Sequence, residues 1–563
     1  MQFFWTIVAL VALLAIAWRF LGPYMAAVFE GRVHWLAWLE RPIYRALGTD
    51  PDQEQTWQRY AGALVIFSAV SILFTFVIIR VQGSLPLNPQ HFGAVGGALS
   101  WNTATSFVTN TNWQNYSGEA TMSYLSQMIA LTVQQFVSPA VGIAVAIALV
   151  RGFARRNSPT IGNFWVDTTR CALYVLLPIA FVFGIVFVAS GAVQTLNGPA
   201  QIHDALNGMS QTIPLGPVGF MEAIKQLGTN GGGFFNANGA HPFENPTGLT
   251  DLLSFVLLLA IPFALTNTFG KMVKNMRQGV ALLAAMVFIF GAWVGFSAYA
   301  EHQANPAVVA AGIAHQPTGN MVGKEVRFGD TTSALYDIAS TQTSTGSVNG
   351  SNDSYTPMGG FGLLTGMMLG EVTPGGTGSG LYTVLIYAII AVFIGGLMIG
   401  RTPEYLGKKI QAREVKLAGL GSLVMPMIVL IFTGIAVSIH AGRAAAFNGG
   451  PHGFTEILYA LTSQGNNNGS AFAGVGSNTA FYNVIGGVDM LLGRFGIMIP
   501  ALALAGSLAA KGVVSESLGT FRTDNGMFVG LVIGVIVIIG GLTFFPAIAL
   551  GPIVEQLSHG KFF

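Results

Sequence analysis

Residues 228–236 read Gly-Thr-Asn-Gly-Gly-Gly-Phe-Phe-Asn, and this polar tract lies between two long apolar stretches of the chain. Three further tracts occupy equivalent places: 109–114 (TNTNWQ), 343–347 (TSTGS) and 466–472 (NNNGSAF). Each is short, uncharged and made mainly of Gly, Thr, Ser and Asn. Each follows a short helix-like segment and precedes a membrane-length apolar segment. The pattern predicts four loops that meet on one axis and take the place of a cation's water shell.

The composition indicates a membrane protein. Of the 563 residues, 52% are hydrophobic and only 9% are charged, whereas soluble domains carry about 25% charged residues. The single Cys171 excludes a disulfide framework and a cysteine-based metal site. The net charge of +2 gives no sign of a nucleic-acid-binding surface.

The apolar segments predict the fold class, an all-α polytopic membrane protein with ten transmembrane helices, because about 20 apolar residues cross a bilayer. The expected spans are 3–21, 61–82, 122–150, 172–194, 250–270, 279–300, 358–400, 417–441, 484–510 and 525–550. The segment 358–400 is too long for one straight span. It is interrupted by the Gly-rich run 371–380 and is therefore expected to form two half-helices joined by an unwound loop.

Basic residues predict the topology. Most of the 26 lysines and arginines lie in the loops 23–60, 151–170, 271–278, 401–416 and 511–522. The positive-inside rule places these loops in the cytoplasm. Both termini and all four polar tracts then face the outside.

An internal repeat accompanies the tracts. Residues 219–222 (GFME) match residues 453–456 (GFTE), and both lead into a Gly/Asn tract. The order of span, short pore helix, tract and span occurs four times, which predicts four channel-like repeats in a pseudo-fourfold arrangement, with one flanking helix at each end. The expected units are 1–60 (first transmembrane helix and cytoplasmic loop), the repeats 61–150, 151–270, 271–400 (with a broken last helix) and 401–510, and 511–563 (last transmembrane helix and external C-terminus).

The chemistry of the tracts favours a cation that loses its water. Pore helices that end at the tracts would turn their partly negative C-terminal ends toward the axis. Backbone carbonyls of the tracts would replace the hydration shell, while Thr, Ser and Asn side chains brace the backbone from behind. No carboxylate lies within the four tracts, which argues against a calcium or magnesium cage.

The chain resembles the KdpA family over essentially its whole length, through the tracts 110–114, 229–235 and 466–474 and the run 400–409 (GRTPEYLGKK). This family provides the potassium-translocating subunit of the bacterial Kdp ATPase and belongs to the superfamily of K⁺ transporters. The resemblance implies a less regular filter than the TVGYG loops of potassium channels. The third tract has a competing register at Asn349-Gly350. The implied potassium-binding filter positions are Asn110, Thr111, Asn112, Thr229, Asn230, Gly231, Ser344, Thr345, Gly346, Asn467, Asn468 and Gly469.

Five further residues are candidates for the ion pathway. The run containing Gly375 and Gly376 is expected to form a gate below the filter, with a simple helix kink as the alternative. Arg494 lies inside a span, where it would repel a second cation, pair with Glu371 or form a structural ion pair. Gln114 is expected either at the inner end of the filter or as a loop cap.

Other polar residues near the tracts receive weaker interpretations. Glu222 and Glu456 on the pore helices would raise the cation density at the mouth or favour the helix dipole. His203, His241 and His452 show no metal-ligand spacing and are expected to be loop residues. Gly239, beyond the second tract, is expected to tolerate serine.

The predicted function is binding of external potassium in a filter and its transfer into an ATP-driven, high-affinity uptake complex. The chain contains no Asp-Lys-Thr-Gly-Thr and no Walker motif, so we expect it not to be an enzyme by itself. The resemblance implies a P-type ATPase partner (KdpB), KdpC and a small KdpF, a bacterial inner membrane, and a tunnel from the filter to the ATPase subunit. The alternative is a Trk/Ktr-type channel or symporter with a cytoplasmic nucleotide-binding ring. No ligand besides potassium is expected.

Overall fold

Ten helical runs long and apolar enough to cross a membrane are present in the computed structural model, which describes residues 2–203, 208–398, 400–514 and 520–558. This confirms the expected number of spans. Their helices are α1 (Gln2–Phe29), α3 (Trp57–Val81), η2 (Ser126–Thr132) with α6 (Val133–Ala154), α7 (Phe164–Arg170) with η3 (Cys171–Leu176) and α8 (Leu177–Ala189), α10 (Gly248–Met272), α11 (Met276–Glu301), α15 (Ser379–Met398), α16 (Ala412–Ser438), α19 (Ala480–Ala509) and α20 (Gly526–Ile548).

Burial separates inner helices from outer ones. The most apolar stretch of α6 is 83% buried inside the protein, against 6% for α1. Four inner helices, α6, α10, α15 and α19, contact one another at the centre. Helix α1 packs along α10 at the periphery, where Trp18 donates a hydrogen bond to the Thr266 hydroxyl.

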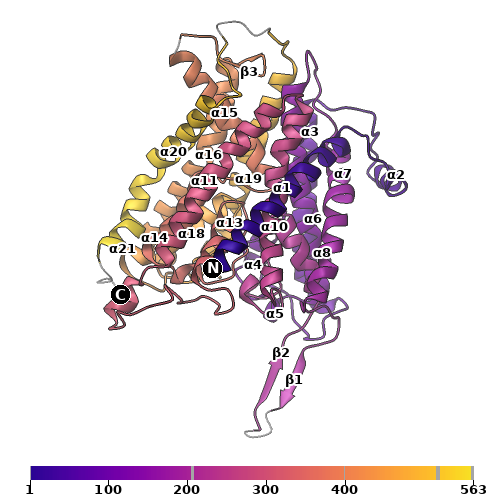
Figure 1. Cartoon of the computed structure of the whole chain (residues 1–563). Helices are drawn as coiled ribbons and strands as arrows, with labels where there is room; N and C mark the ends of the chain where they lie inside the picture. The colour runs from indigo at the N-terminus through magenta and orange to yellow at the C-terminus, as the bar shows by residue number, and fades with distance from the viewer. Residues whose placement is uncertain (1, 204–207, 399, 515–519, 559–563) are drawn as a thin grey trace.

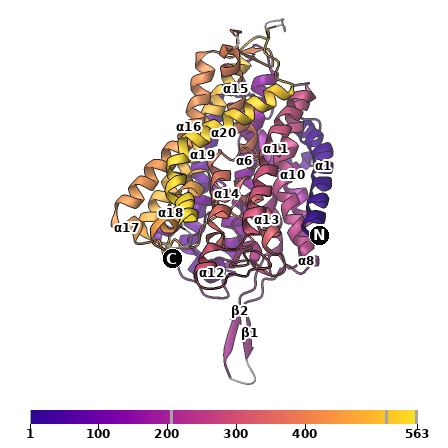
Figure 2. The ribbon, with the colours of Figure 1, turned by 60° about the vertical axis from the view of Figure 1, so that its left-hand side comes forward.

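Four short helices lie between the two spans of each repeat and are largely buried: α4 (Gly97–Val108), α9 (Gly219–Leu227), α13 (Asp330–Thr341) and α18 (Gly450–Gly465). Each of these pore helices contacts the inner helix of its own repeat and that of the preceding repeat. The pairs are α4 with α6 and α19, α9 with α10 and α6, α13 with α14 (Pro357–Met368) and α10, and α18 with α19 and α14. This cyclic pattern is the pseudo-fourfold arrangement that the repeated sequence order predicts, and Figures 1 and 2 show the pore helices gathered toward one end of the molecule.

The last helix of the third repeat is broken, as the Gly-rich run predicted. Helix α14 ends at Met368, and α15 begins at Ser379. The ten residues between them form an irregular loop (residues 369–378), which is buried apart from a half-buried Gly370. Two half-helices therefore replace one straight span.

Short strands and helices lie at both ends of the molecule. Two antiparallel hairpins, which were not expected from the sequence, pair β1 (Ala200–His203) with β2 (Ser210–Ile213) and β3 (Glu404–Tyr405) with β4 (Lys408–Lys409). The β1–β2 hairpin projects from the pore-helix end, and β3 lies at the opposite end (Figure 1). The remaining helical pieces are η1 (Gln82–Ser84), α2 (Ala37–Ala46), α5 (Gly118–Thr121), η4 (Asn238–Ala240), α12 (Pro306–Ala310), η5 (Asn352–Ser354), α17 (His440–Arg443), η6 (Ala549–Ile553) and α21 (Val554–Leu557).

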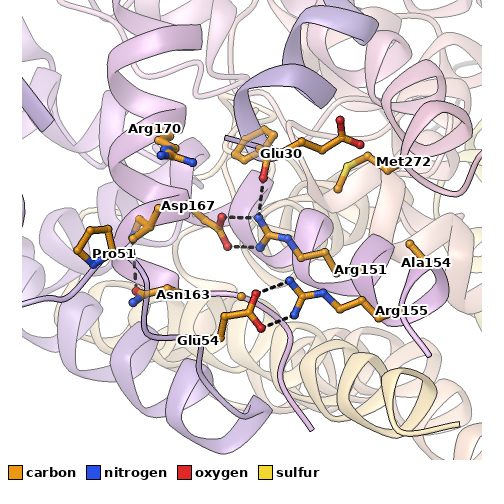
Figure 3. A pocket seen from close by; sticks show the side chains of 13 residues that line it. Glu30, Pro51, Glu54, Arg151, Ala154, Arg155, Asn163, Asp167, Arg170 and Met272 are labelled. Atoms are coloured by element: carbon orange, nitrogen blue, oxygen red, sulfur yellow. Dashed lines mark hydrogen bonds and ion pairs between the residues drawn. The ribbon is translucent and has the colours of Figure 1, made fainter. Parts of the chain in front are cut away.

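The end opposite the pore helices, which we call the basic end, is held together by arginine–carboxylate pairs. Arg151 donates to both carboxylate oxygens of Asp167 at 2.6 and 2.8 Å, and Arg155 binds Glu54 in the same two-pronged manner. Both pairs line a cavity of about 380 Å³ (Figure 3). The start of α1 and helix α21 lie at the other end, while residues 559–563, expected outside the cell, fall outside the described residues.

Candidate functional site

The four polar tracts share an unusual backbone course. The residue two or three positions beyond each pore helix adopts a left-handed conformation, which non-glycine residues rarely do. Its φ angle is 66° at Asn110, 48° at Thr229, 51° at Ser344 and 59° at Asn467. Two residues later, φ is again positive at Asn112, Gly231 and Gly469. The predicted triplets thus begin at equivalent points, including Ser344 in the third tract, whereas Asn349 of the competing register donates to the Asp251 carboxylate.

Close backbone contacts join the second, third and fourth tracts. The Gly346 nitrogen donates to the Asn230 carbonyl at 3.3 Å. A Cβ added to Gly231 would lie 2.1 Å from that same nitrogen. A Cβ added to Gly346 would in turn lie 2.7 Å from the carbonyl carbon of Gly469. Any side chain beyond glycine at these two positions would push neighbouring tracts apart.

The first tract completes the ring. A Cβ on Gly469 would lie 2.0 Å from the Thr111 carbonyl oxygen, and the Asn467 amide donates to the Thr111 hydroxyl at 3.0 Å. On the other side of the first tract, the side-chain amide of Asn110 donates to the backbone carbonyls of Gly228 and Thr229 in the second tract. The tracts therefore meet in the order first, second, third, fourth and back to the first.

Side chains brace the tracts from behind, as expected. The hydroxyls of Thr109 and Thr111 lie 2.8 Å apart in the first tract, and those of Thr343 and Thr345 lie 2.8 Å apart in the third. In the fourth tract, the Asn467 amide also donates to the Met490 carbonyl of α19 at 2.8 Å. These contacts fix the backbone without placing a charge in the tracts.

A buried charge cluster, which was not expected from the sequence, supports the second tract. The Lys225 ammonium lies 2.5 Å from Glu222, 2.6 Å from Glu244 and 2.8 Å from the side-chain amide oxygen of Asn238. The Asn238 amide donates to the Gly231 carbonyl at 2.6 Å. That carbonyl is turned toward Asn238, so the proposed role of Gly231 depends on the close approach of its backbone to the third tract.

This cluster also corrects the interpretation of Glu222. Its carboxylate is 1% exposed and paired with Lys225, because both groups lie on the inner side of α9. It is therefore not a free charge at the mouth. Glu456 is likewise buried, and it accepts from Asn448 and from the Phe447 nitrogen.

A cavity of about 520 Å³ opens over the ring, and we call it the vestibule. The third residues of all four triplets line it, together with residues of the loops 236–240, 323–325 and 350–352. Gln114 also lines this cavity and brackets Gly233, donating to its carbonyl at 3.1 Å and accepting from its nitrogen at 3.0 Å. The expectation that Gln114 lies at the inner end was wrong, because the chain leaves the ring toward the vestibule; its bonds fit the alternative of a loop brace.

The broken helix lies against the opposite side of the ring. Thr377 donates to the Gly228 carbonyl and to the Thr229 hydroxyl, both at 3.0 Å. The Gly375 nitrogen donates to the Gln342 carbonyl at 2.8 Å. A Cβ on Gly376 would lie 2.9 Å from the Ser344 Cβ. The loop 369–378 thus contacts the first residues of the second and third tracts.

Glu371 and Arg494 are buried on this same side but do not pair. The Glu371 carboxylate accepts from the Ser344 hydroxyl and, at 2.7 Å, from the Asn468 amide. The Arg494 guanidinium donates to the Ser138 carbonyl at 3.1 Å. These partners are not each other, so the alternative in which Arg494 pairs with Glu371 was wrong.

Of the three histidines expected in loops, only His241 lies in one, where its ring stacks on the Phe235 ring with the ring centroids 3.7 Å apart. His203 lies in β1. His452 lies on α18, where it is buried among carboxylates. These contacts were not expected from the sequence, because Asp353 and Glu555 lie 99 and 103 positions from His452.

Comparisons with known proteins agree on one family. The model of the potassium-transporting ATPase A subunit family (KdpA) matches residues 7–557. Proteins named potassium-transporting ATPase potassium-binding subunit are similar to this chain: 56% identical in Mesorhizobium japonicum, covering 96% of each chain, and 53% identical in Solibacter usitatus, covering 98% of each.

A solved structure of the potassium transporter TrkH from Vibrio parahaemolyticus has a similar fold. The TM-score is 0.51 at 13% identity, over 87% of this chain and 96% of the other. This likeness supports the channel-like arrangement of spans and pore helices. The extent of the family match and the identity to its members together show that the chain belongs to the family of potassium-transporting ATPase A subunits.

Proposed function

We propose that this chain binds potassium at the ring of four tracts and passes it into an ATP-driven uptake complex. The observation that carries the proposal is the closed ring itself, in which four uncharged tracts meet at the C-terminal ends of four pore helices through close backbone approaches and the side-chain bonds of Asn110. The partly negative helix ends favour a cation, and closely spaced carbonyls can replace its water. The twelve predicted triplet residues are the proposed filter.

The proposed pathway runs from the vestibule through the ring to the loop 369–378. Glu371 lies at the inner side of the ring, where a carboxylate would attract a cation leaving the filter. Arg494 lies buried nearby and would disfavour a second cation there. Gly376 approaches Ser344 of the third tract, and Gly375 bonds Gln342 just before it, so movement of this loop would open or close the inner exit.

The energy for potassium transport is proposed to come from a partner subunit in a complex. The relatives are named as potassium-binding subunits of a potassium-transporting ATPase, which supports a partner that hydrolyses ATP. We propose that this partner is a KdpB-like P-type ATPase subunit, accompanied by KdpC-like and small KdpF-like subunits. The basic end would face the cytoplasm of a bacterial inner membrane, with the vestibule and both termini outside. The repeat boundaries drawn from the sequence remain part of this proposal.

The Trk/Ktr-type alternative is not favoured. Its support is the likeness to TrkH, which at 13% identity concerns the fold alone. The family model and the relatives above 50% identity are those of an ATPase subunit.

Purification and ATPase measurement test the proposal. The tagged chain is isolated from its native membrane, and ATP hydrolysis is measured across a potassium titration for the complex and for the chain alone. We expect a co-purifying P-type ATPase and potassium-stimulated hydrolysis in the complex only. Co-purification of a nucleotide-binding ring without an ATPase, or potassium-stimulated hydrolysis by the isolated chain, would contradict the proposal.

A further inference from the structure

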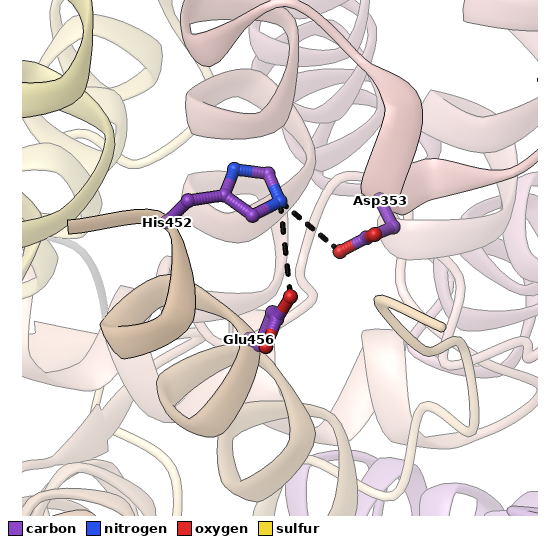
Figure 4. A group of neighbouring side chains, drawn as sticks. All are labelled: Asp353, His452 and Glu456. Atoms are coloured by element: carbon purple, nitrogen blue, oxygen red, sulfur yellow. Dashed lines mark hydrogen bonds and ion pairs between the residues drawn. The ribbon is translucent and has the colours of Figure 1, made fainter. Parts of the chain in front are cut away.

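A group of metal-ligand side chains lies at the pore-helix end, outside the ring. His452 at the start of α18, Glu456 one turn later and Asp353 of η5 offer three ligand atoms within 4.8 Å of one another (Figure 4). The His452 Nε2 lies 3.2 Å from an Asp353 oxygen and 4.0 Å from a Glu456 oxygen. Zinc held at about 2.0–2.2 Å by nitrogen and oxygen ligands needs similar separations.

A second layer of contacts orients these ligands. The other ring nitrogen of His452, Nδ1, lies 2.9 Å from the Glu555 carboxylate of α21. This carboxylate–histidine arrangement is the one that fixes the ring of metal-bound histidines. The Glu456 carboxylate accepts from the Asn448 amide at 2.6 Å and from the Phe447 nitrogen at 3.1 Å. His452 and Glu456, two of the three side chains that would face an ion, are therefore already held by their neighbours.

We propose that Asp353, His452 and Glu456 bind a divalent transition-metal ion of the zinc class, with Glu555 as the positioning residue for His452. One imidazole and two carboxylates suit zinc, while magnesium and calcium prefer oxygen ligands alone. A cavity of about 180 Å³ lined by Asp353, His452 and Glu555 gives access to the cluster.

Charge supports a divalent ion. Three carboxylates surround one imidazole, and the imidazole carries at most one positive charge. A divalent ion bound here would offset the negative charge that remains on the cluster.

The ion would fasten segments that belong to different repeats. Asp353 belongs to the third repeat, His452 and Glu456 to the fourth pore helix, and Glu555 to the C-terminal helix. Asn352, next to Asp353, donates to the Tyr459 hydroxyl at 3.1 Å, and that hydroxyl lies 2.8 Å from the Ser470 hydroxyl, just beyond the fourth triplet. A bound ion would thus stiffen the outer support of the ring.

Calorimetry on the full-length protein, purified with its native subunits and stripped of metal by a chelator, tests this site. We expect saturable binding of one Zn²⁺ per chain and no competition from Mg²⁺. His452→Gln and Glu456→Gln should abolish this binding. Glu555→Gln should weaken it about 10- to 100-fold, as expected for a residue that orients a ligand.

His302→Gln is the matched control, because His302 also contacts a carboxylate, Asp330, but at an exposed position away from the cluster. It should leave zinc binding unchanged. If His452→Gln fails to fold, two other measurements test the site. These are zinc binding by Asp353→Asn, at the partly exposed edge of the cluster, and zinc-edge anomalous diffraction of the unmodified protein. Absence of saturable zinc binding, equal binding by the His452→Gln or Asp353→Asn variant, or anomalous density elsewhere only would overturn the proposal.

Discussion

Replacing Gly231 by serine tests whether the four tracts form one selective ion site. Gly231 has a φ of +91°, where an L-residue costs about 1 kcal/mol or more. Its Cβ would lie 2.1 Å from the Gly346 nitrogen and 2.3 Å from the Ser347 nitrogen. Non-bonded heavy atoms separate by about 3.5 Å, so the third tract must shift by about 1.4 Å. Both obstacles are backbone atoms, which no rotamer change can move aside.

The expected effect is a loss of potassium affinity in an assembled complex. A combined cost of about 1.5–3 kcal/mol at the ring corresponds to a roughly 10- to 100-fold higher half-saturating potassium concentration. Selectivity should relax as well, because a displaced tract matches potassium and rubidium less well and loses less for ions of other sizes. Gly469→Ser should act in the same direction, since its Cβ would lie 2.0 Å from the Thr111 carbonyl oxygen.

The assay is potassium-stimulated ATP hydrolysis or uptake across a potassium titration, with rubidium and ammonium as competitors. The expectation that Gly239 tolerates serine was wrong. A Cβ at Gly239 would lie 2.8 Å from the Val348 carbonyl oxygen, so Gly239→Ser cannot serve as a control variant. Gly248→Ser is a better control, since Gly248 is exposed and has open space around it. Unchanged half-saturation and selectivity in both the Gly231 and Gly469 variants, with the complex intact, would refute the filter assignment.

Three further predictions follow from buried charges. Arg494→Met should alter ion flux or the number of ions moved per ATP more than the melting temperature, because Arg494 bonds a backbone carbonyl without pairing to Glu371; a variant that melts early but transports normally would make the residue structural. Lys225→Met should destabilise the protein by about 3–5 kcal/mol, because it leaves two buried carboxylates without their cation, and thermal unfolding beside the exposed-site control Lys274→Met measures this; an equal effect of both variants would contradict it. In chelator-treated protein, the raised pKa of His452 contributes stability that is complete below about pH 6.5 and is lost as pH rises through about 10. The melting temperature should thus fall between pH 7 and 10 more steeply for the unmodified protein than for His452→Gln, and parallel curves would count against this reasoning.

Local sequence patterns were sufficient for the spans and for the start of each tract. Apolar runs of about 20 residues have few alternatives to a membrane helix, and the interruption at 371–380 breaks its span where Gly and Pro concentrate. The triplets begin at equivalent left-handed residues because each follows directly on a pore helix. These features depend on residues that are adjacent in the sequence, so one sequence is enough to predict them.

Contacts between segments that are not neighbours in the sequence could not be predicted from these local patterns. Lys225 meets Glu244 because the chain folds back within the second repeat, and His452 meets Asp353 and Glu555 only when different repeats come together. The position of Gln114 was mistaken for a related reason: the sequence does not reveal in which direction the chain leaves the ring. The contacts of Glu371 could not be predicted either, because its partners Ser344 and Asn468 belong to two different repeats.

The structure also explains why glycine occupies some ring positions and not others. At the first position of each triplet, a non-glycine residue accepts the strain of a positive φ, and hydrogen bonds from Asn110 and Asn467 to neighbouring backbone help to hold it. At the third position, glycine stands in three tracts, where the next backbone approaches closely, while the first tract has Asn112. A homotetramer would impose one residue on all four positions. Four repeats on one chain allow this asymmetry, so the first tract can differ from the others in shape and in the groups it turns toward the ion.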